Sequence, residues 1–147
     1  MSPLPGSVLF ACSQNSVRSP VAEAILKQLH RRRVFVDSVG VRADPVDPFA
    51  VAAMAEIGID LSHHRAKTFD ELEDDSFDLI VTLSPEAHHR ALELTRTLSV
   101  DVEYWPTFDP TVVEGSREIR LDSYRGMRDA LWDRIAARFP GLPTPAP

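Results

Sequence analysis

The stretch that most constrains the fold is residues 8–20, VLFACSQNSVRSP, which contains the only cysteine of the chain, Cys12. The four apolar residues before Cys12 predict a buried strand, the five after it form a polar loop, and Ser19 and Pro20 are typical of a helix start. Such a loop can turn its backbone N–H groups inward, and the helix dipole adds positive potential at its mouth. The stretch therefore predicts a strand, an anion-sized loop and a helix N-terminus in immediate succession.

Two side chains give this loop a chemical character. Arg18 carries a fixed charge and a planar fork of donors that suits a tetrahedral oxyanion. Cys12 stands where the loop, the helix dipole and Arg18 converge, which favours its thiolate form over the thiol. We interpret the pair as a nucleophilic thiolate at the bottom of a phosphate-shaped cradle. The alternative is an inert buried cysteine near a surface arginine.

The stretch resembles the low-molecular-weight protein tyrosine phosphatase family, whose signature is a cysteine, five residues, an arginine and a Ser-Pro pair after the first strand. The residues on this motif are Cys12, Asn15, Arg18, Ser19 and Pro20. Gln14 stands where the family usually has glycine, and Val17 where it usually has a second cysteine. The resemblance extends, with decreasing specificity, over roughly residues 7 to 135, through the segments 38–40, 43–48, 58–62, 64–67, 77–80 and 109–110.

Within the loop we expect Cys12 and Arg18 to be catalytic. The other loop residues are expected to bind the substrate phosphate, and these are Ser13, Gln14, Asn15, Ser16, Val17 and Ser19. Asn15 is further expected to hold the loop in shape, and Ser19 to stabilise the thiolate of Cys12.

Strands and helices alternate along the rest of the chain. We expect strands at 8–11, 34–39, 77–83 and 100–105, and helices at 20–33, 47–58, 68–71, 84–98 and from 116 to 139. This alternation predicts a three-layer α/β fold, with a four-stranded parallel sheet in the order 2-1-3-4 and helices on both faces. In that order the loop after the first strand lies at the switch point, where open sheets bind ligands.

The length of 147 residues fits one phosphatase-like domain at 1–139, followed by a Pro-rich tail at 140–147 that we expect to be disordered. The net charge of −6 argues against nucleic acid as a partner. A single cysteine fits a reducing compartment, and no apolar run approaches the ~20 residues of a membrane span. We therefore expect a cytoplasmic protein with no membrane partner, and the sequence leaves its oligomeric state open.

Hydrolysis of a phosphomonoester needs a proton donor for the leaving oxygen, and Asp109 is our candidate. Asp109 follows the fourth expected strand, at the same edge of the sheet as Cys12, and Pro110 restricts the backbone beside it. In the resembled family an Asp-Pro pair at this place carries the general acid. The alternative is an aspartate that caps a turn before proline.

Departures from the family pattern bear on the substrate. Members that act on phosphotyrosine line the pocket rim with aromatic residues, whereas here Thr111 and Val112 follow the Asp-Pro pair. Ser16 stands where phosphotyrosine-directed members have a bulky aliphatic residue. A small hydroxyl residue at this position resembles the phosphoarginine phosphatases and the related arsenate reductases. Val17 removes the neighbouring thiol that can protect the nucleophile as a disulfide. Phosphotyrosine is therefore expected to be a weak substrate.

Three functions follow, of which we expect the first. It is a phosphatase without metal or cofactor, which hydrolyses phosphorylated protein residues or small phosphomonoesters through a cysteinyl-phosphate. The second is an arsenate reductase that uses an external small thiol, since the thioredoxin-coupled type needs two further cysteines. The third is a non-catalytic phosphate-binding regulator. The adjacent pairs His63-His64 and His88-His89 cannot both face one site from a helix, and we assign them no function.

Overall fold

The computed structural model describes residues 4–72 and 76–141. Its elements, in chain order, are β1 (Ser7–Cys12), α1 (Arg18–His30), β2 (Phe35–Gly40), α2 (Pro48–Ala55), the 3-10 helix η1 (Phe69–Glu71), β3 (Leu79–Thr82), α3 (Pro85–Leu94), β4 (Asp101–Tyr104), the 3-10 helix η2 (Pro110–Val112) and α4 (Arg117–Arg138). From residue 142 onward, the tail expected at 140–147 lies outside the described residues.

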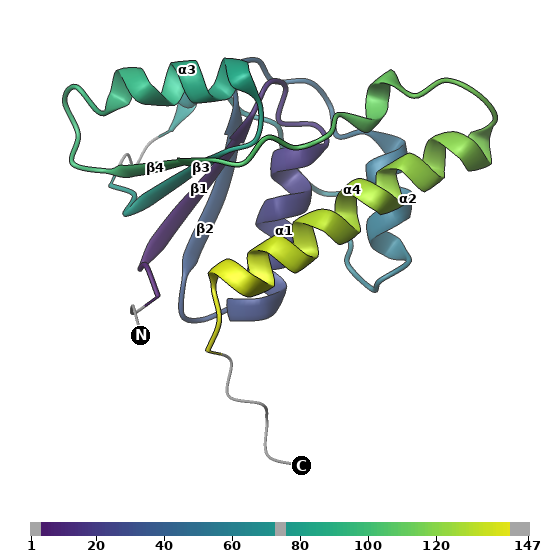
Figure 1. Cartoon of the computed structure of the whole chain (residues 1–147), viewed down its shortest axis with the longest axis horizontal. Coiled ribbons are helices and arrows are strands. Elements are labelled where there is room, and N and C mark those ends of the chain that lie inside the picture. Colours follow the sequence, from purple (N-terminus) through teal and green to yellow (C-terminus); the bar gives the residue numbers. More distant parts are fainter. Residues whose placement is uncertain (1–3, 73–75, 142–147) are drawn as a thin grey trace, which may run out of the picture.

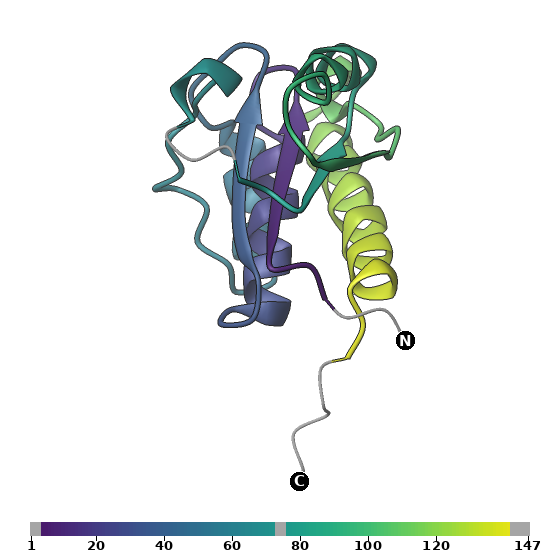
Figure 2. The ribbon, with the colours of Figure 1, turned by 90° about the vertical axis from the view of Figure 1, so that its left-hand side faces the viewer.

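The four strands form one parallel sheet in the order β2-β1-β3-β4, as the sequence predicts (Figure 1). The helices α1 and α4 cover one face of the sheet, α2 packs on α4, and α3 covers the other face (Figures 1 and 2). The three-layer α/β architecture is therefore confirmed. Cys12 ends the inner strand β1, opposite Gly40 at the end of β2.

The strand β1 divides the core into two. Val8, Phe10 and Cys12 belong to the larger cluster under α1 and α4, whereas Leu9 and Ala11 belong to the smaller cluster under α3. All five side chains are buried, which explains why the strand is a continuous apolar run rather than an alternating one. No helix within the described ranges is long and apolar enough to cross a membrane.

Side-chain caps fix the starts of the later helices. Asp47, Ser84 and Ser116 cap α2, α3 and α4, and each accepts a backbone N–H two or three residues further on. The starts of these helices agree with the sequence because capping is a local interaction. On α4 the expected buried side is confirmed, and it consists of Tyr124, Met127, Leu131, Ile135 and, just beyond the helix, Phe139.

Three helices differ from the expected bounds. The helix α2 ends at Ala55 rather than at Gly58, and residues 56–58 form turns. The helix α1 begins at Arg18 rather than at Pro20, because Val21 N–H already donates to the carbonyl of Val17 at 3.1 Å. It ends at His30, and the arginines 31–33 lie in a turn in which the N–H groups of residues 33 and 34 both return to the His30 carbonyl. The helix α3 ends at Leu94, and residues 95–97 form turns.

Candidate active site

The loop between β1 and α1 has the form of an anion site. The carbonyl oxygens of Ser13, Gln14 and Ser16 accept N–H groups from residues 42, 44 and 47, at 2.8 to 3.0 Å. Within the described ranges, none of the N–H groups of residues 13–17 donates to a protein acceptor. The carbonyl groups of the loop are thus paired with the neighbouring segment. Its N–H groups, beside the N-terminus of α1, remain able to donate to an anion.

Gly40 allows the loop to lie this close to the end of β2. A Cβ atom at this position would be 2.3 Å from the carbonyl oxygen of Arg42 and 2.6 Å from the backbone nitrogen of Asn15. Both neighbours are backbone atoms, which cannot move aside as a flexible side chain can. Glycine is therefore required here by the approach of the loop.

The Cys12 thiol is buried against Ser19. Its Sγ lies 2.9 Å from the hydroxyl oxygen of Ser19, and Cys12 is 2% exposed. The Ser19 oxygen also accepts from Nδ2 of Asn15 at 2.9 Å and lies 3.3 Å from the carbonyl oxygen of Val39. A hydroxyl has one proton, and a thiolate can only accept, so Ser19 donates to Cys12 in the thiolate form.

Asn15 ties the loop to three other segments. Its backbone has a φ of 53°, which asparagine tolerates better than most residues, and its side chain is buried. Nδ2 donates to the hydroxyls of Ser19 and Ser38, both at 2.9 Å. Oδ1 accepts from the N–H of Lys67 at 2.9 Å and lies 3.1 Å from Nε2 of His64. The amide is fully paired, and these bonds hold the loop in place.

His64 is a part of the site that the sequence reasoning missed. Its Nε2 lies 3.1 Å from both Oδ1 and the carbonyl oxygen of Asn15, and because both are acceptors, Nε2 carries the proton. Burial lowers the pKa of His64 below its ordinary value of 6.5, against the opposing effect of Glu23. His63 points to solvent, so the two histidines do diverge. The sequence feature that could have identified His64 is the segment 64–67, which resembles the family.

Arg18 connects the loop with the region of Asp109. Its Nη1 donates to the carbonyl oxygen of Thr107 at 3.1 Å, and its Nη2 lies 4.0 Å from Oδ2 of Asp109. The other oxygen of Asp109, Oδ1, accepts from the N–H and the hydroxyl of Thr111 at 3.0 and 2.7 Å. Asp109 therefore caps η2 with one oxygen, as the alternative interpretation has it, and turns the other oxygen toward Arg18.

The structure brings Cys12, Arg18 and Asp109 to one edge of the sheet. The other loop side chains do not gather with them. Asn15, Ser16 and Val17 are buried, and Val17 belongs to the core cluster under α1. Ser13 is half-buried, and its hydroxyl donates to that of Ser84 at 3.1 Å. A phosphate role for the buried members would therefore run through their backbone N–H groups.

The rim of the site has few aromatic side chains. Val112 is 66% exposed and Thr111 is also exposed, whereas Trp105 is 3% exposed and packs against Phe10 in the core. Phe108, at 57% exposed, is the aromatic of this region that reaches solvent. In the part of the chain that the structure describes, no three His, Cys, Asp or Glu side chains gather as metal ligands.

Comparison with known proteins gives a family and several relatives. The family described as Low molecular weight phosphotyrosine protein phosphatase matches residues 7–141. The arsenate reductase of Halalkalibacterium halodurans is 36% identical over 129 residues, which cover 87% of this chain and 91% of that protein. The arsenate reductase of Bacillus subtilis is 33% identical over 128 residues, which cover 87% of this chain and 91% of that protein.

The solved structures that are similar to this chain include an arginine phosphatase and an arsenate reductase. A mutant of YwlE from Bacillus subtilis superposes with a TM-score of 0.73 at 28% identity, and covers 88% of this chain and 93% of that one. A mutant YwlE arginine phosphatase with a phosphorylated active-site serine has a TM-score of 0.72 at 27% identity, covering 88% and 90%. An arsenate reductase in the phosphate-binding state has a TM-score of 0.70 at 27% identity, covering 91% and 98%.

Proposed function

The chain belongs to the low molecular weight phosphotyrosine protein phosphatase family, and we propose on that premise that it is a cysteine-dependent phosphatase acting through a cysteinyl-phosphate. The observation that carries the proposal is the position of Arg18. One guanidinium group lies at the start of α1, directly after the loop of Cys12, and contacts the segment of Asp109. Pure phosphate binding would require neither the thiol nor the carboxyl group, which argues against a non-catalytic regulator.

The first step transfers the phosphoryl group to the enzyme. Sγ of Cys12 attacks phosphorus, and the bond from phosphorus to the leaving oxygen or nitrogen breaks. Asp109 donates a proton from Oδ2 to the leaving atom, which departs as an alcohol or, from phosphoarginine, as the guanidino group of arginine. Arg18 and the free N–H groups of residues 13–17 stabilise the negative charge on the three equatorial oxygens.

The second step restores the enzyme. Asp109, now a carboxylate, accepts a proton from a water molecule, and the oxygen of that water attacks phosphorus. The bond between phosphorus and sulfur breaks, inorganic phosphate leaves, and Cys12 returns to the thiolate that Ser19 stabilises. The proton that Asp109 gave away in the first step is thus recovered, and the cycle needs no metal or cofactor.

The direct test is hydrolysis of p-nitrophenyl phosphate. We expect activity in the presence of a metal chelator and its loss in Cys12→Ser, because serine is a much weaker nucleophile than a thiolate. A Cys12→Ser protein that folds and retains wild-type activity, or a wild type inactivated by the chelator, would refute the proposal.

For the substrate we propose phosphoarginine or a small phosphomonoester in preference to phosphotyrosine. Thr111 and Val112 give a phenyl ring no stacking partner at the rim, and an aromatic pair is worth about 0.5–1.5 kcal/mol beyond its area. Ser16 has a hydroxyl that can accept from a guanidinium group. A structural neighbour is an arginine phosphatase. The measurement is kcat/KM on matched phosphotyrosine, phosphoserine and phosphoarginine peptides, and a preference for phosphotyrosine would assign the rim to Phe108.

Arsenate reduction is the second candidate, because the relatives reported above are named arsenate reductases. Arsenate has the shape and charge of phosphate and would enter the same cradle. Reduction to arsenite takes two electrons, and with one cysteine in the chain an external thiol must complete the disulfide with Cys12. Arsenate-dependent consumption of glutathione or a similar thiol, faster than p-nitrophenyl phosphate hydrolysis, would favour this function over the phosphatase.

A further inference from the structure

A second concave site lies between the segment after β4 and the helix α4. It has a volume of about 380 Å³, within the range of small-molecule sites. Pro106, Thr107 and Phe108 line one side, and side chains of α4 line the other, with the buried Met127 and Leu131 among them. Cys12, Arg18 and Asp109 do not line this groove, which adjoins the candidate active site through Phe108 and through Thr107, whose carbonyl oxygen accepts from Arg18.

Gly126 keeps the groove open at its middle. It lies inside α4, where glycine costs about 1 kcal/mol relative to alanine. A Cβ atom there would meet no heavy atom within 4 Å, so packing within the chain does not require glycine. A helix position that gives up stability without a packing reason is typical of a surface that binds something.

The groove is mostly apolar, and its polar side chains are the hydroxyls of Thr107 and Ser123 and one positively charged group. Among the described residues that line it, Arg134 is the one with a charged side chain. Its guanidinium lies over the ring of Trp105, 4.8 Å from the ring centroid, which holds it beside the groove. No ion pair within 4.0 Å joins it to a described carboxylate. Glu103 is the nearby acid: it is bonded to Arg138 at 2.8 Å and to Nε1 of Trp105 at 3.1 Å, and its pKa is lowered mainly by Arg138 and to a lesser extent by the charge of Arg134.

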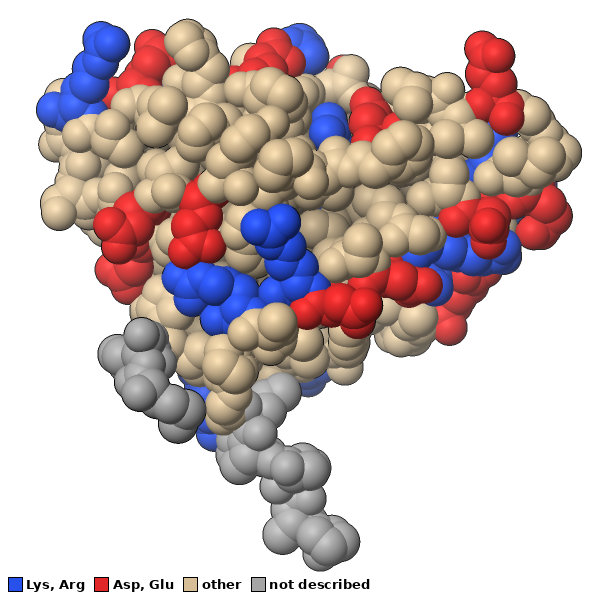
Figure 3. Space-filling view, in the orientation of Figure 1, with Lys and Arg blue, Asp and Glu red and all other residues tan. Residues whose placement is uncertain are grey.

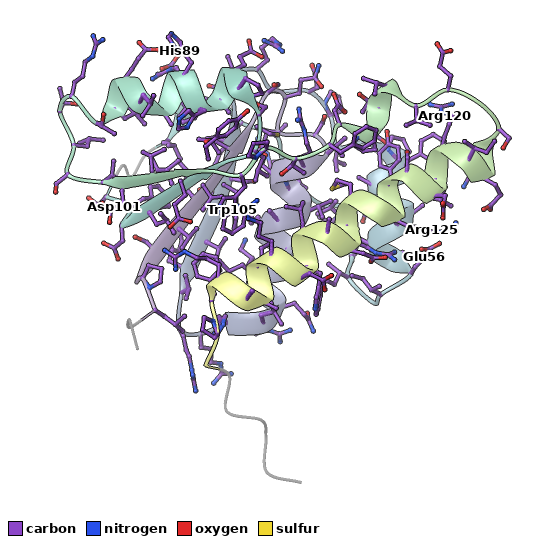
Figure 4. All side chains as sticks on the ribbon, viewed as in Figure 1. Glu56, His89, Asp101, Trp105, Arg120 and Arg125 are labelled. Carbon is purple, nitrogen blue, oxygen red and sulfur yellow. The ribbon has the colours of Figure 1, made fainter. Side chains whose placement is uncertain are left out.

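The surface agrees with this description. In Figure 3 the face between the segment 105–112 and α4 is mostly uncharged, and charged side chains of both signs border it below. Figure 4 shows Trp105 where the chain leaves β4 and turns toward α4. Phe108 adds a large apolar side chain that is 57% exposed.

We propose that this groove binds a small carboxylate whose body is an aromatic ring or a branched aliphatic chain. The body packs against Phe108, Met127 and the open surface at Gly126, and the carboxylate pairs with the guanidinium of Arg134. An apolar cavity with a single cation at its border fits an amphipathic anion better than it fits a neutral or polyanionic ligand. The site does not depend on the proposed phosphatase function, because binding is measured without turnover.

The test is an NMR titration of the full ¹⁵N-labelled chain with 3-phenylpropanoate. Saturating inorganic phosphate is present throughout, so that the loop 13–17 is not free to take up the carboxylate. We expect saturable shift changes at Gly126, Phe108 and Arg134, and about tenfold weaker binding of the uncharged analogue 3-phenylpropanamide. This analogue isolates the charge without any change to the protein.

Three variants complete the test. Arg134→Gln should weaken 3-phenylpropanoate about tenfold, and Ala130→Leu should abolish its binding by filling the groove from an exposed position of α4. Arg96→Gln, at an exposed position after α3 and outside the groove, is the matched control and should bind as the wild type does. Equal affinity for acid and amide, changes confined to residues 13–18, or changes that appear with protein concentration alone and so reveal a second copy in the groove, would each overturn the proposal.

Discussion

Arg18 donates a hydrogen bond from Nη1 to the carbonyl oxygen of Thr107 at 3.1 Å, although the two residues are 89 positions apart in the chain. The bond joins the start of α1 to the segment that carries Asp109. The same guanidinium lies 4.0 Å from Oδ2 of Asp109. The anion loop and the proposed acid are therefore positioned relative to each other by one side chain, and not by the sheet alone.

This relationship makes Arg18→Lys a severe change despite the conserved charge. Lysine cannot bridge a phosphate oxygen and the Thr107 carbonyl with a planar fork, so kcat/KM on p-nitrophenyl phosphate should fall by roughly 10²–10³-fold. Arg42→Lys is the matched control, because Arg42 is exposed and bonds Glu86 outside the loop. Equal losses in the two variants would show that Arg18 has no special role.

Asp109→Asn tests the acid. Turnover of poor leaving groups should fall by roughly 10²–10⁴-fold, the usual range for a positioned acid, with a smaller loss for p-nitrophenolate, which leaves without a proton. A series of aryl and alkyl phosphates gives the dependence on leaving-group pKa. If all leaving groups are slowed equally, the role of Asp109 is limited to the cap of η2 that its Oδ1 already makes.

Two glycines should respond to alanine in opposite directions. Gly40→Ala places a methyl group against backbone atoms of Arg42 and Asn15 and should lower the free energy of unfolding by about 1–3 kcal/mol, with loss of activity. In Gly126→Ala the added methyl group extends into open space within a helix, and the free energy of unfolding should rise by about 1 kcal/mol. Urea unfolding of both variants measures this, and a stable, active Gly40→Ala would contradict the described approach of the loop.

The contact between α2 and α4 should be sensitive to acid. Glu56 and Arg125 face each other across these helices (Figure 4), and hydrogen bonds from Arg125 and then Arg128 lower the pKa of Glu56 from 4.5 to about 2. A carboxyl group with a lowered pKa stabilises the folded state fully above the unfolded value, and this contribution is lost as pH falls from 4.5 toward 2.

The stability gap between the wild type and Glu56→Gln should therefore be largest near pH 7 and close on acidification. Urea unfolding at several pH values measures the gap, and Glu114→Gln, at an exposed position outside this cluster, is the control. A gap that stays constant down to pH 3 would show that the ion pairs of Glu56 do not contribute to stability.

The fold could be predicted from the sequence because its signals are local. The apolar runs of β1 and β3 identify buried parallel strands, and the caps at Asp47, Ser84 and Ser116 lie within three residues of the N–H groups they accept. The C-terminal ends of α1 and α3 were harder to predict, because no glycine or proline follows them closely. At His30 the helix ends where its carbonyl accepts from the following turn and its ring bonds the Phe139 carbonyl, a contact 109 residues away.

The residues of the candidate site likewise divide into those that could be predicted from the sequence and those that could not. Cys12, Arg18 and Asp109 could be singled out from motif and strand order. The partnership of His64 with Asn15 could not, because it spans 49 residues and one histidine of an adjacent pair has no local sign of facing inward. The contact of Arg18 with Thr107 likewise depends on how the start of α1 meets the segment after β4, and the groove beside Phe108 depends on how α4 packs against that segment.

The proposed mechanism requires a covalent bond between phosphorus and Sγ of Cys12. Rapid acid quench of the enzyme during turnover of p-nitrophenyl phosphate, followed by mass spectrometry of the peptide that contains residues 8–20, detects it. We predict one phosphoryl group on Cys12 in the wild type, its accumulation in Asp109→Asn with this good leaving group, and none in Cys12→Ala. Undiminished turnover in Cys12→Ala, or turnover with no phosphoryl group ever found on Cys12, would contradict the account.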